Sequence, residues 1–106
     1  MQEPKKIFFI GSSYKELESF PGEKREQFVQ DLEMMKVGQK PLSNSKRMNG
    51  LGHGVTELRR NGRPAFRCVY VEKGNAIYVL YAFKKTSDGT QKHHEEKIKS
   101  RFKKIP

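Results

Sequence analysis

The sequence predicts an α+β fold, in which a small, mainly antiparallel sheet carries an N-terminal helical hairpin on one face and is followed by a C-terminal helix. Apolar residues recur at helical spacing between residues 23 and 37 and again between residues 91 and 104. Three β-like runs, joined by turn residues, lie between these two segments. The expected order is β-α-α-β-β-β-α, and a chain of 106 residues fits a single domain over residues 1–106.

The first strand and the first helix are expected to be short. Ile7–Ile10 is an apolar run bounded by lysines and Gly11, which is typical of a short strand. Ser13 and Glu16 have the spacing of a capping box, in which each side chain accepts a hydrogen bond from the other residue's backbone N–H. A helix is therefore expected to begin there, and Pro21-Gly22 interrupts it.

A longer second helix is expected over Glu23–Val37. Phe28, Leu32 and Met35 recur there at i, i+4 and i+7, and a glycine ends the helix. Both helices are too short to be stable alone, so we expect them to form a hairpin whose apolar stripes lie on the sheet. The next segment, Gln39–Gly54, is rich in Pro, Ser, Asn and Gly and is expected to be a loop.

The second part of the chain predicts an antiparallel meander of three strands and then a helix. Hairpin-turn residues separate the three runs, which are Gly54–Arg60, Ala65–Val71 and Asn75–Lys84. The last helix is expected over Gln91–Lys104, where His94, Ile98 and Phe102 recur at i, i+4 and i+8.

Alternation along the predicted strands sorts their side chains into two faces. Glu57 and Arg59 share one face of their strand. In the next strand, Phe66 and Cys68 oppose Arg67. One face of the sheet is therefore expected to be apolar and the other to bear arginines.

The excess positive charge lies in the second part of the chain. Residues 1–45 carry seven Lys/Arg and seven Asp/Glu, whereas residues 46–106 carry fifteen and five, which accounts for the net charge of +10. Basic groups that a sheet displays indicate a polyanionic partner such as nucleic acid.

Composition argues against several other classes of protein. No apolar run approaches the roughly 20 residues that span a bilayer, so no membrane segment is expected. The single cysteine, Cys68, cannot form an internal disulfide, which fits a cytoplasmic protein. His53, His93 and His94 lack Cys or carboxylate partners at ligand spacing, although two glutamates adjoin the pair, so no metal or other cofactor is expected.

Three segments resemble the pattern of the RelE/ParE toxin superfamily. They are Gly54–Arg59, Phe66–Tyr70 and Val79–Thr86, of which the last is the strongest piece. Within the superfamily the chain is most similar to the HigB-like, phage-derived branch, and the resemblance covers nearly the whole chain. It implies a small endoribonuclease that cuts messenger RNA, usually on the ribosome, and that a cognate antitoxin holds inactive. The chain departs from RelE-type members at Val55 and Glu57, where those members place lysines.

Residue chemistry also fits cleavage of RNA. The ribose 2′-hydroxyl can act as internal nucleophile, provided that the protein moves two protons and stabilises charge on the phosphorane, and this needs no metal. Arginine suits the second task because its planar fork donates parallel hydrogen bonds to phosphate. The catalytic candidates are Arg59, Arg67, Lys84, Lys85 and His93. Alternation predicts that one of the two lysines faces the site, and each candidate also has an ordinary interpretation as a solvated surface residue.

Further residues are expected to hold the RNA. They are Lys46, Arg47, Arg60, Tyr81 and Lys92. A tyrosine ring can stack on a splayed RNA base, although a core role is also common. The basic last helix has three possible contacts, namely RNA, the ribosome and the antitoxin, or it simply faces solvent.

These observations predict the toxin of a toxin–antitoxin pair, a ribosome-dependent messenger-RNA endoribonuclease whose partners are mRNA, the ribosome and an antitoxin. One alternative is a ParE-like inhibitor of DNA gyrase, which would act in a supercoiling assay. Another is a non-catalytic nucleic-acid-binding or regulatory module, which would retain nucleic acid in a salt-sensitive way without cutting it.

Overall fold

The protein, seen in a computed structural model, is described over residues 3–86 and 92–106. In chain order its elements are β1 (Lys6–Phe9), α1 (Ser13–Glu18), α2 (Gly22–Lys36), β2 (Asn44–Arg47), β3 (Thr56–Arg60), β4 (Ala65–Lys73), β5 (Ala76–Lys85) and α3 (Lys92–Phe102). The predicted order is confirmed except for one additional strand, β2. The predicted first residue of the last helix, Gln91, lies outside the described residues. Within the described ranges, no helix is long and apolar enough to cross a bilayer.

The strands form one sheet in the order β1-β5-β4-β3-β2. Strands β3, β4 and β5 are antiparallel neighbours, which confirms the predicted meander. The outer strand β1 runs parallel to β5, and β2 is the outer strand at the opposite edge. The sheet is therefore mainly antiparallel, as predicted.

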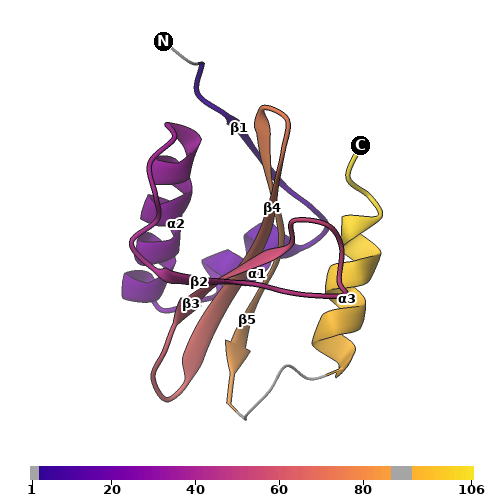
Figure 1. Ribbon diagram of the computed structural model, residues 1–106. Coiled ribbons are helices and arrows are strands. Elements are labelled where there is room, and N and C mark those ends of the chain that lie inside the picture. The colour runs from indigo at the N-terminus through magenta and orange to yellow at the C-terminus, as the bar shows by residue number, and fades with distance from the viewer. Residues whose placement is uncertain (1–2, 87–91) are drawn as a thin grey trace.

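Helices α1 and α2 cover one face of the sheet, and α3 lies on the other (Figure 1). Phe28 and Leu32 of α2 pack with Leu58, Phe66 and Cys68 of the sheet. These three strand residues are the ones that alternation assigns to the apolar face. The predicted hairpin, with its apolar stripes on the sheet, is confirmed.

The opposite face is only partly charged, contrary to the expectation of one apolar and one arginine-bearing face. Val69, Val71 and Leu80 form a second buried cluster with Ile98 of α3. Helix α3 therefore covers part of this face, and the charged residues of β3 and β4 occupy the rest.

Strand β2 lies in a segment that the sequence predicts to be a loop. All four of its residues are exposed, so no apolar alternation marks it. Its conformation depends on neighbours, because β3 pairs with it and the fully buried Asp31 of α2 holds the chain just before it. The Asp31 carboxylate accepts hydrogen bonds from the backbone N–H groups of Leu42 and Ser43 at 2.8 and 3.2 Å.

The predicted capping box at Ser13 and Glu16 is wrong, although helix α1 does begin at Ser13. Ser12 occupies the N-cap position and makes no side-chain cap hydrogen bond. The Ser13 hydroxyl instead donates to the Val79 carbonyl at 2.9 Å, and Glu16 accepts from Arg101 of α3 at 2.7 and 2.9 Å. Both side chains are thus used to attach α1 to β5 and α3.

Candidate functional site

Basic side chains from three neighbouring strands meet on the face that carries α3. Arg59 of β3 pairs with Arg67 of β4. Lys85 of β5 pairs with Ala65, two residues before Arg67 on the same strand. Strand alternation therefore gives Arg59, Arg67 and Lys85 one common face. Lys46 of β2, which pairs with Glu57 of β3, belongs to the same face.

The carboxylate of Glu57 lies between the two arginines. Its Oε1 atom is 3.3 Å from Arg59 Nε and 3.4 Å from Arg67 Nε. The side chains of Glu57 and Arg67 are only 6% and 4% exposed, whereas that of Arg59 is 29% exposed. Glu57 therefore fixes one buried and one accessible guanidinium side by side.

Burial dominates the ionisation of this cluster. It raises the pKa of Glu57, although Arg67, Arg59, Lys85 and Lys46 all act in the opposite direction. Burial likewise lowers the pKa of Arg67, and the nearby Glu57 charge offsets part of that change. The same four cations that alternation assigns to this face are thus close enough to influence the Glu57 carboxylate.

A groove of about 950 Å³ opens at the end of the sheet where these residues lie. Its charged lining residues are Arg59, Arg63, Arg67, Lys84 and Lys85. Among the lining residues that the structure describes there is no carboxylate. We call this hollow the cationic groove, and its charge suits a phosphate group.

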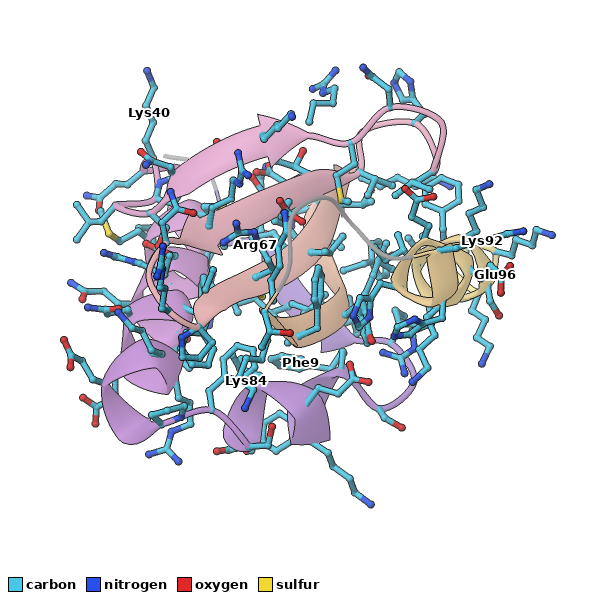
Figure 2. All side chains as sticks on the ribbon, turned by 90° about the horizontal axis from the view of Figure 1, so that it is seen from below. Phe9, Lys40, Arg67, Lys84, Lys92 and Glu96 are labelled. Atoms are coloured by element: carbon cyan, nitrogen blue, oxygen red, sulfur yellow. The ribbon has the colours of Figure 1, made fainter. Side chains whose placement is uncertain are left out.

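The two consecutive lysines at the end of β5 lie on opposite faces. Lys84 pairs with Phe66 and lies beside α1, whereas Arg67 lies on the other side of the strands (Figure 2). Lys84 therefore lines the cationic groove from the helical face, and Lys85 is the lysine that shares the face of Arg59 and Arg67. Arg60 also belongs to the helical face, where its Nε donates to Ser43 Oγ at 2.7 Å.

Two of the expected RNA-binding residues lie away from the groove. Arg47 pairs with Thr56 and so shares the helical face, not the face of Arg59 and Arg67. Lys92 is the exposed first residue of α3 and lies on the side of that helix away from the sheet in Figure 2.

Aromatic rings connect the strands that line the cationic groove to α3. Phe83 pairs with Arg67, and the His94 ring stacks on Phe83 with 4.3 Å between ring centroids. His94 Nδ1 lies 2.6 Å from the Tyr81 hydroxyl. His93 is exposed, and its ring centroid is 4.0 Å from that of His94. Burial, followed by the neighbouring His93 charge, lowers the pKa of His94.

The structure assigns Tyr81 to the core. The residue is 5% exposed, and its ring stacks on Phe83 with 5.2 Å between centroids. The guanidinium carbon of Arg101 lies 5.1 Å from the Tyr81 ring centroid. A ring packed in this way stabilises α3 on the sheet instead of presenting a face to an RNA base.

Sequence reasoning placed Glu57 on the face of Arg59 but did not count it among the site residues, and it missed Arg101, which links α3 to α1 and β5. Arg101 and Glu16 are 85 residues apart, so no local pattern relates them.

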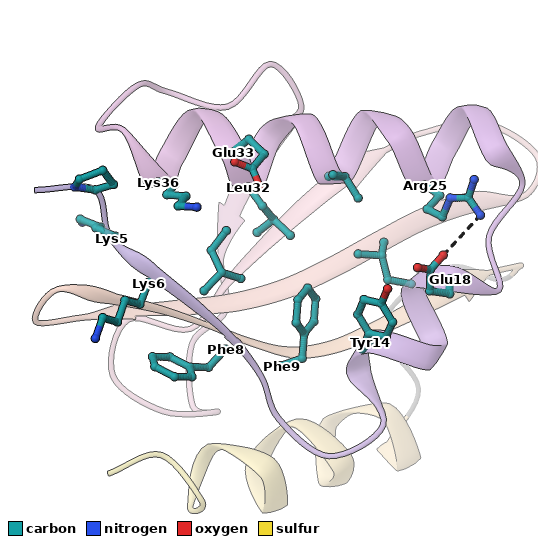
Figure 3. A pocket seen from close by; sticks show the side chains of 14 residues that line it. Lys5, Lys6, Phe8, Phe9, Tyr14, Glu18, Arg25, Leu32, Glu33 and Lys36 are labelled. Carbon is teal, nitrogen blue, oxygen red and sulfur yellow. Dashed lines mark hydrogen bonds and ion pairs between the residues drawn. The ribbon is translucent and has the colours of Figure 1, made fainter.

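A second hollow, of about 700 Å³, lies between β1, α1 and α2 (Figure 3). Tyr14 and Val29 at this hollow are 53% and 42% exposed. Its other apolar lining residues include Ile7, Phe9 and Leu32. We call it the hairpin groove.

Metal-ligand geometry is not found in the part of the chain that the structure describes. No group of three or more His, Cys, Asp or Glu side chains there is arranged to hold an ion. The lone cysteine is fully buried, and burial raises the pKa of its thiol to about 12.

Comparisons with known proteins agree with this architecture. Residues 15–103 match the family described as Phage derived protein Gp49-like (DUF891). No curated protein matches the chain. A solved structure of a double-arginine mutant of the E. coli toxin RelE, in the free state, has 15% identity and a TM-score of 0.62, over 97% of this chain and 99% of that one.

A second solved structure contains a partner protein. The toxin–antitoxin complex RelBE2 from Mycobacterium tuberculosis has 16% identity and a TM-score of 0.54, over 82% of this chain and 98% of the matched chain. At these identities, both likenesses show a shared fold.

Proposed function

This chain belongs to the phage-derived, Gp49-like family and has the RelE fold, and we propose on that premise that it is a messenger-RNA endoribonuclease, the toxin of a toxin–antitoxin pair. Its membership confirms the resemblance to the RelE/ParE toxin superfamily. The proposal further includes cutting on the ribosome and attack by the ribose 2′-hydroxyl.

The observation that supports the proposal most is the convergence of Arg59, Arg67 and Lys85 from three adjacent strands at the cationic groove. Cleavage of an RNA link passes through a phosphorane that carries extra negative charge. Cations held in place before the reaction stabilise such a charge without reorganising. A sheet is rigid enough to hold them.

The three cations differ in exposure and therefore in how they can act on the phosphate. Arg59 is partly exposed, and Lys85 is half-buried, so both can donate hydrogen bonds to the non-bridging phosphate oxygens. Arg67 is buried beside Glu57 and supplies positive charge from beneath. The 2′-oxygen attacks the phosphorus, the bond to the 5′-oxygen breaks, and a 2′,3′-cyclic phosphate and a 5′-hydroxyl result.

Two protons move in this reaction, one from the 2′-hydroxyl and one to the departing 5′-oxygen, and we assign one of these transfers to His93. It is exposed at the start of α3, next to His94, whose ring stacks on the Phe83 that pairs with Arg67. Imidazole titrates near neutral pH, which suits an acid–base group. Glu57 is a positioning residue, because its carboxylate is buried between the arginines that it orients.

The hairpin groove supports the antitoxin part of the proposal. It combines exposed apolar side chains with the outer strand β1, whose second edge is open to a partner strand. It lies away from the cationic groove, with which it shares none of the described lining residues. A protein partner can therefore dock there without filling the cationic groove.

The proposal is tested by adding the purified protein to translating ribosomes and mapping the message by primer extension. We expect cuts within the translated region at stoichiometric protein. Intact message would reject the nuclease. Inhibition of gyrase supercoiling by the same preparation would favour the ParE-like alternative.

The antitoxin part has its own test. A neighbouring gene is expected to encode a small acidic or helix-turn-helix protein. Co-expression of that protein should restore growth, and the protein should co-purify with this chain. Val29→Lys in the hairpin groove should abolish the co-purification, and retention of the complex in that variant would place the partner elsewhere.

A further inference from the structure

We propose that a third hollow, on the helical face of the sheet, binds the base of a nucleotide that flanks the cut link. This inference rests on the proposed function, since it concerns the same RNA strand. The hollow measures about 680 Å³ and lies where the connection between α1 and α2 passes the ends of β4 and β5. We call it the flanking pocket.

The flanking pocket has an aromatic floor. Phe20 and Phe66 meet there edge to face, with 4.9 Å between ring centroids, beside the small Ala82. Pro21 and Pro64 also line it. The two rings are only 7% and 5% exposed, so the apolar surface offered to a nucleobase is that of the exposed Pro21 and Pro64 beside them.

The flanking pocket is continuous with the cationic groove. Pro64 and Lys84 line both hollows. Lys85 and Lys84 lie on opposite faces of β5, and Lys85 lines only the cationic groove. An RNA strand that passes over the end of the sheet would therefore meet Lys85 at the cut phosphate and Lys84 at the next one.

The charges around the flanking pocket are compatible with RNA. Lys24 and Lys84 contribute positive charge. Glu16 is already paired with Arg101 through both carboxylate oxygens, which offsets its negative charge. Glu23 remains as an exposed acceptor that can bind amino groups on a base edge.

Binding of uncleavable RNA tests the inference. The probes are fluorescent 2′-O-methyl oligonucleotides of two and four residues, which lack the nucleophile, and fluorescence anisotropy measures their affinity. We expect the longer probe to bind the wild-type protein roughly tenfold more tightly than the shorter one, because one more base is buried in the flanking pocket. Phe66→Leu and Lys24→Ala should remove this advantage and leave binding of the shorter probe unchanged.

Lys40→Ala is the matched control, since Lys40 is an exposed lysine far from both hollows (Figure 2). Lys24→Ala changes a side chain at the surface, so it keeps the test valid if Phe66→Leu unfolds the protein. Equal affinities of the two probes for the wild-type protein, or an advantage that survives Lys24→Ala, would overturn the inference. Intact message on ribosomes would instead reject the nuclease itself, so the two failures are distinct.

Discussion

Glu57 determines the arrangement of the cations more than any other single residue. Its carboxylate contacts both Arg59 and Arg67 from a buried position. Glu57→Gln keeps the shape of the side chain and leaves the buried Arg67 without a counter-charge. We expect this change to lower the free energy of unfolding by about 3 kcal/mol, as measured by urea denaturation.

The surface pair Arg25–Glu18 provides the control for this prediction. Its two side chains are 39% and 43% exposed, so Glu18→Gln should cost less than about 1 kcal/mol. Equal losses in the two variants would show that the buried pair contributes no more than a surface pair.

His94 should make stability depend on pH. Burial holds the pKa of His94 below its ordinary value, so the unfolded chain takes up a proton that the folded protein resists. The free energy of unfolding must then fall as the pH falls below about 6.5. Urea denaturation at pH 7.5 and 5.5 should show a smaller loss in His94→Gln than in the wild-type protein, and an identical loss would contradict this role.

At the residue level, alternation predicted which strand side chains share a face. It placed Arg59 and Arg67 together from the sequence alone, and the pairing of β3 with β4 confirms that placement. It left open which of Lys84 and Lys85 belongs to the site, because this depends on the register of β5 against β4. It also gave no sign that Arg67 is buried, since burial depends on what covers the sheet.

The ion pair of Arg101 with Glu16 links helix α3 to α1 and β5, in addition to the apolar contacts of α3. Arg101 binds both carboxylate oxygens of Glu16 and also donates to the Leu80 carbonyl at 2.9 Å. Arg101→Ala should release α3, which would be seen as faster hydrogen exchange of its amides while α2 is unaffected. Lys99→Ala on the exposed side of α3 is the control, and unchanged exchange in Arg101→Ala would show that the apolar contacts suffice.

The loop between β2 and β3 supports α3 through a close approach at Gly52. This glycine has a φ of +142°, and a Cβ atom there would lie 2.8 Å from the Phe102 ring. Gly52→Ala should therefore cost about 2 kcal/mol more than Gly50→Ala, where φ is +81° and a Cβ atom would meet nothing within 4 Å. Thermal denaturation of both variants measures the difference, and equal midpoints would contradict the contact.

At the element level, the sequence predicted those elements that bury apolar side chains. Helix α2 and strands β3 to β5 carry a clear apolar period and were located within a few residues. Strand β2 carries none, because both of its faces are exposed and its pairing comes from β3. The capping box failed for a related reason, since Ser13 and Glu16 found tertiary partners in β5 and α3.

For the whole molecule, charge and family pattern predicted the kind of site but not its boundaries. The basic second part of the chain does supply the cationic groove. The sheet nevertheless divides the predicted residues between its two faces, with Arg60 and Lys84 on the helical side. Which basic residues act together is a property of the assembled sheet, and it could not be read from their order in the chain.

The central claim is that guanidinium and ammonium groups from adjacent strands stabilise the reacting phosphate. The most direct test is the single-turnover rate of message cutting on ribosomes by Arg59→Ala and Lys85→Ala, with Lys40→Ala as control. We predict a loss of about 10²-fold in each of the first two variants and an unchanged rate in the control. Full cutting by both Arg59→Ala and Lys85→Ala would contradict the claim.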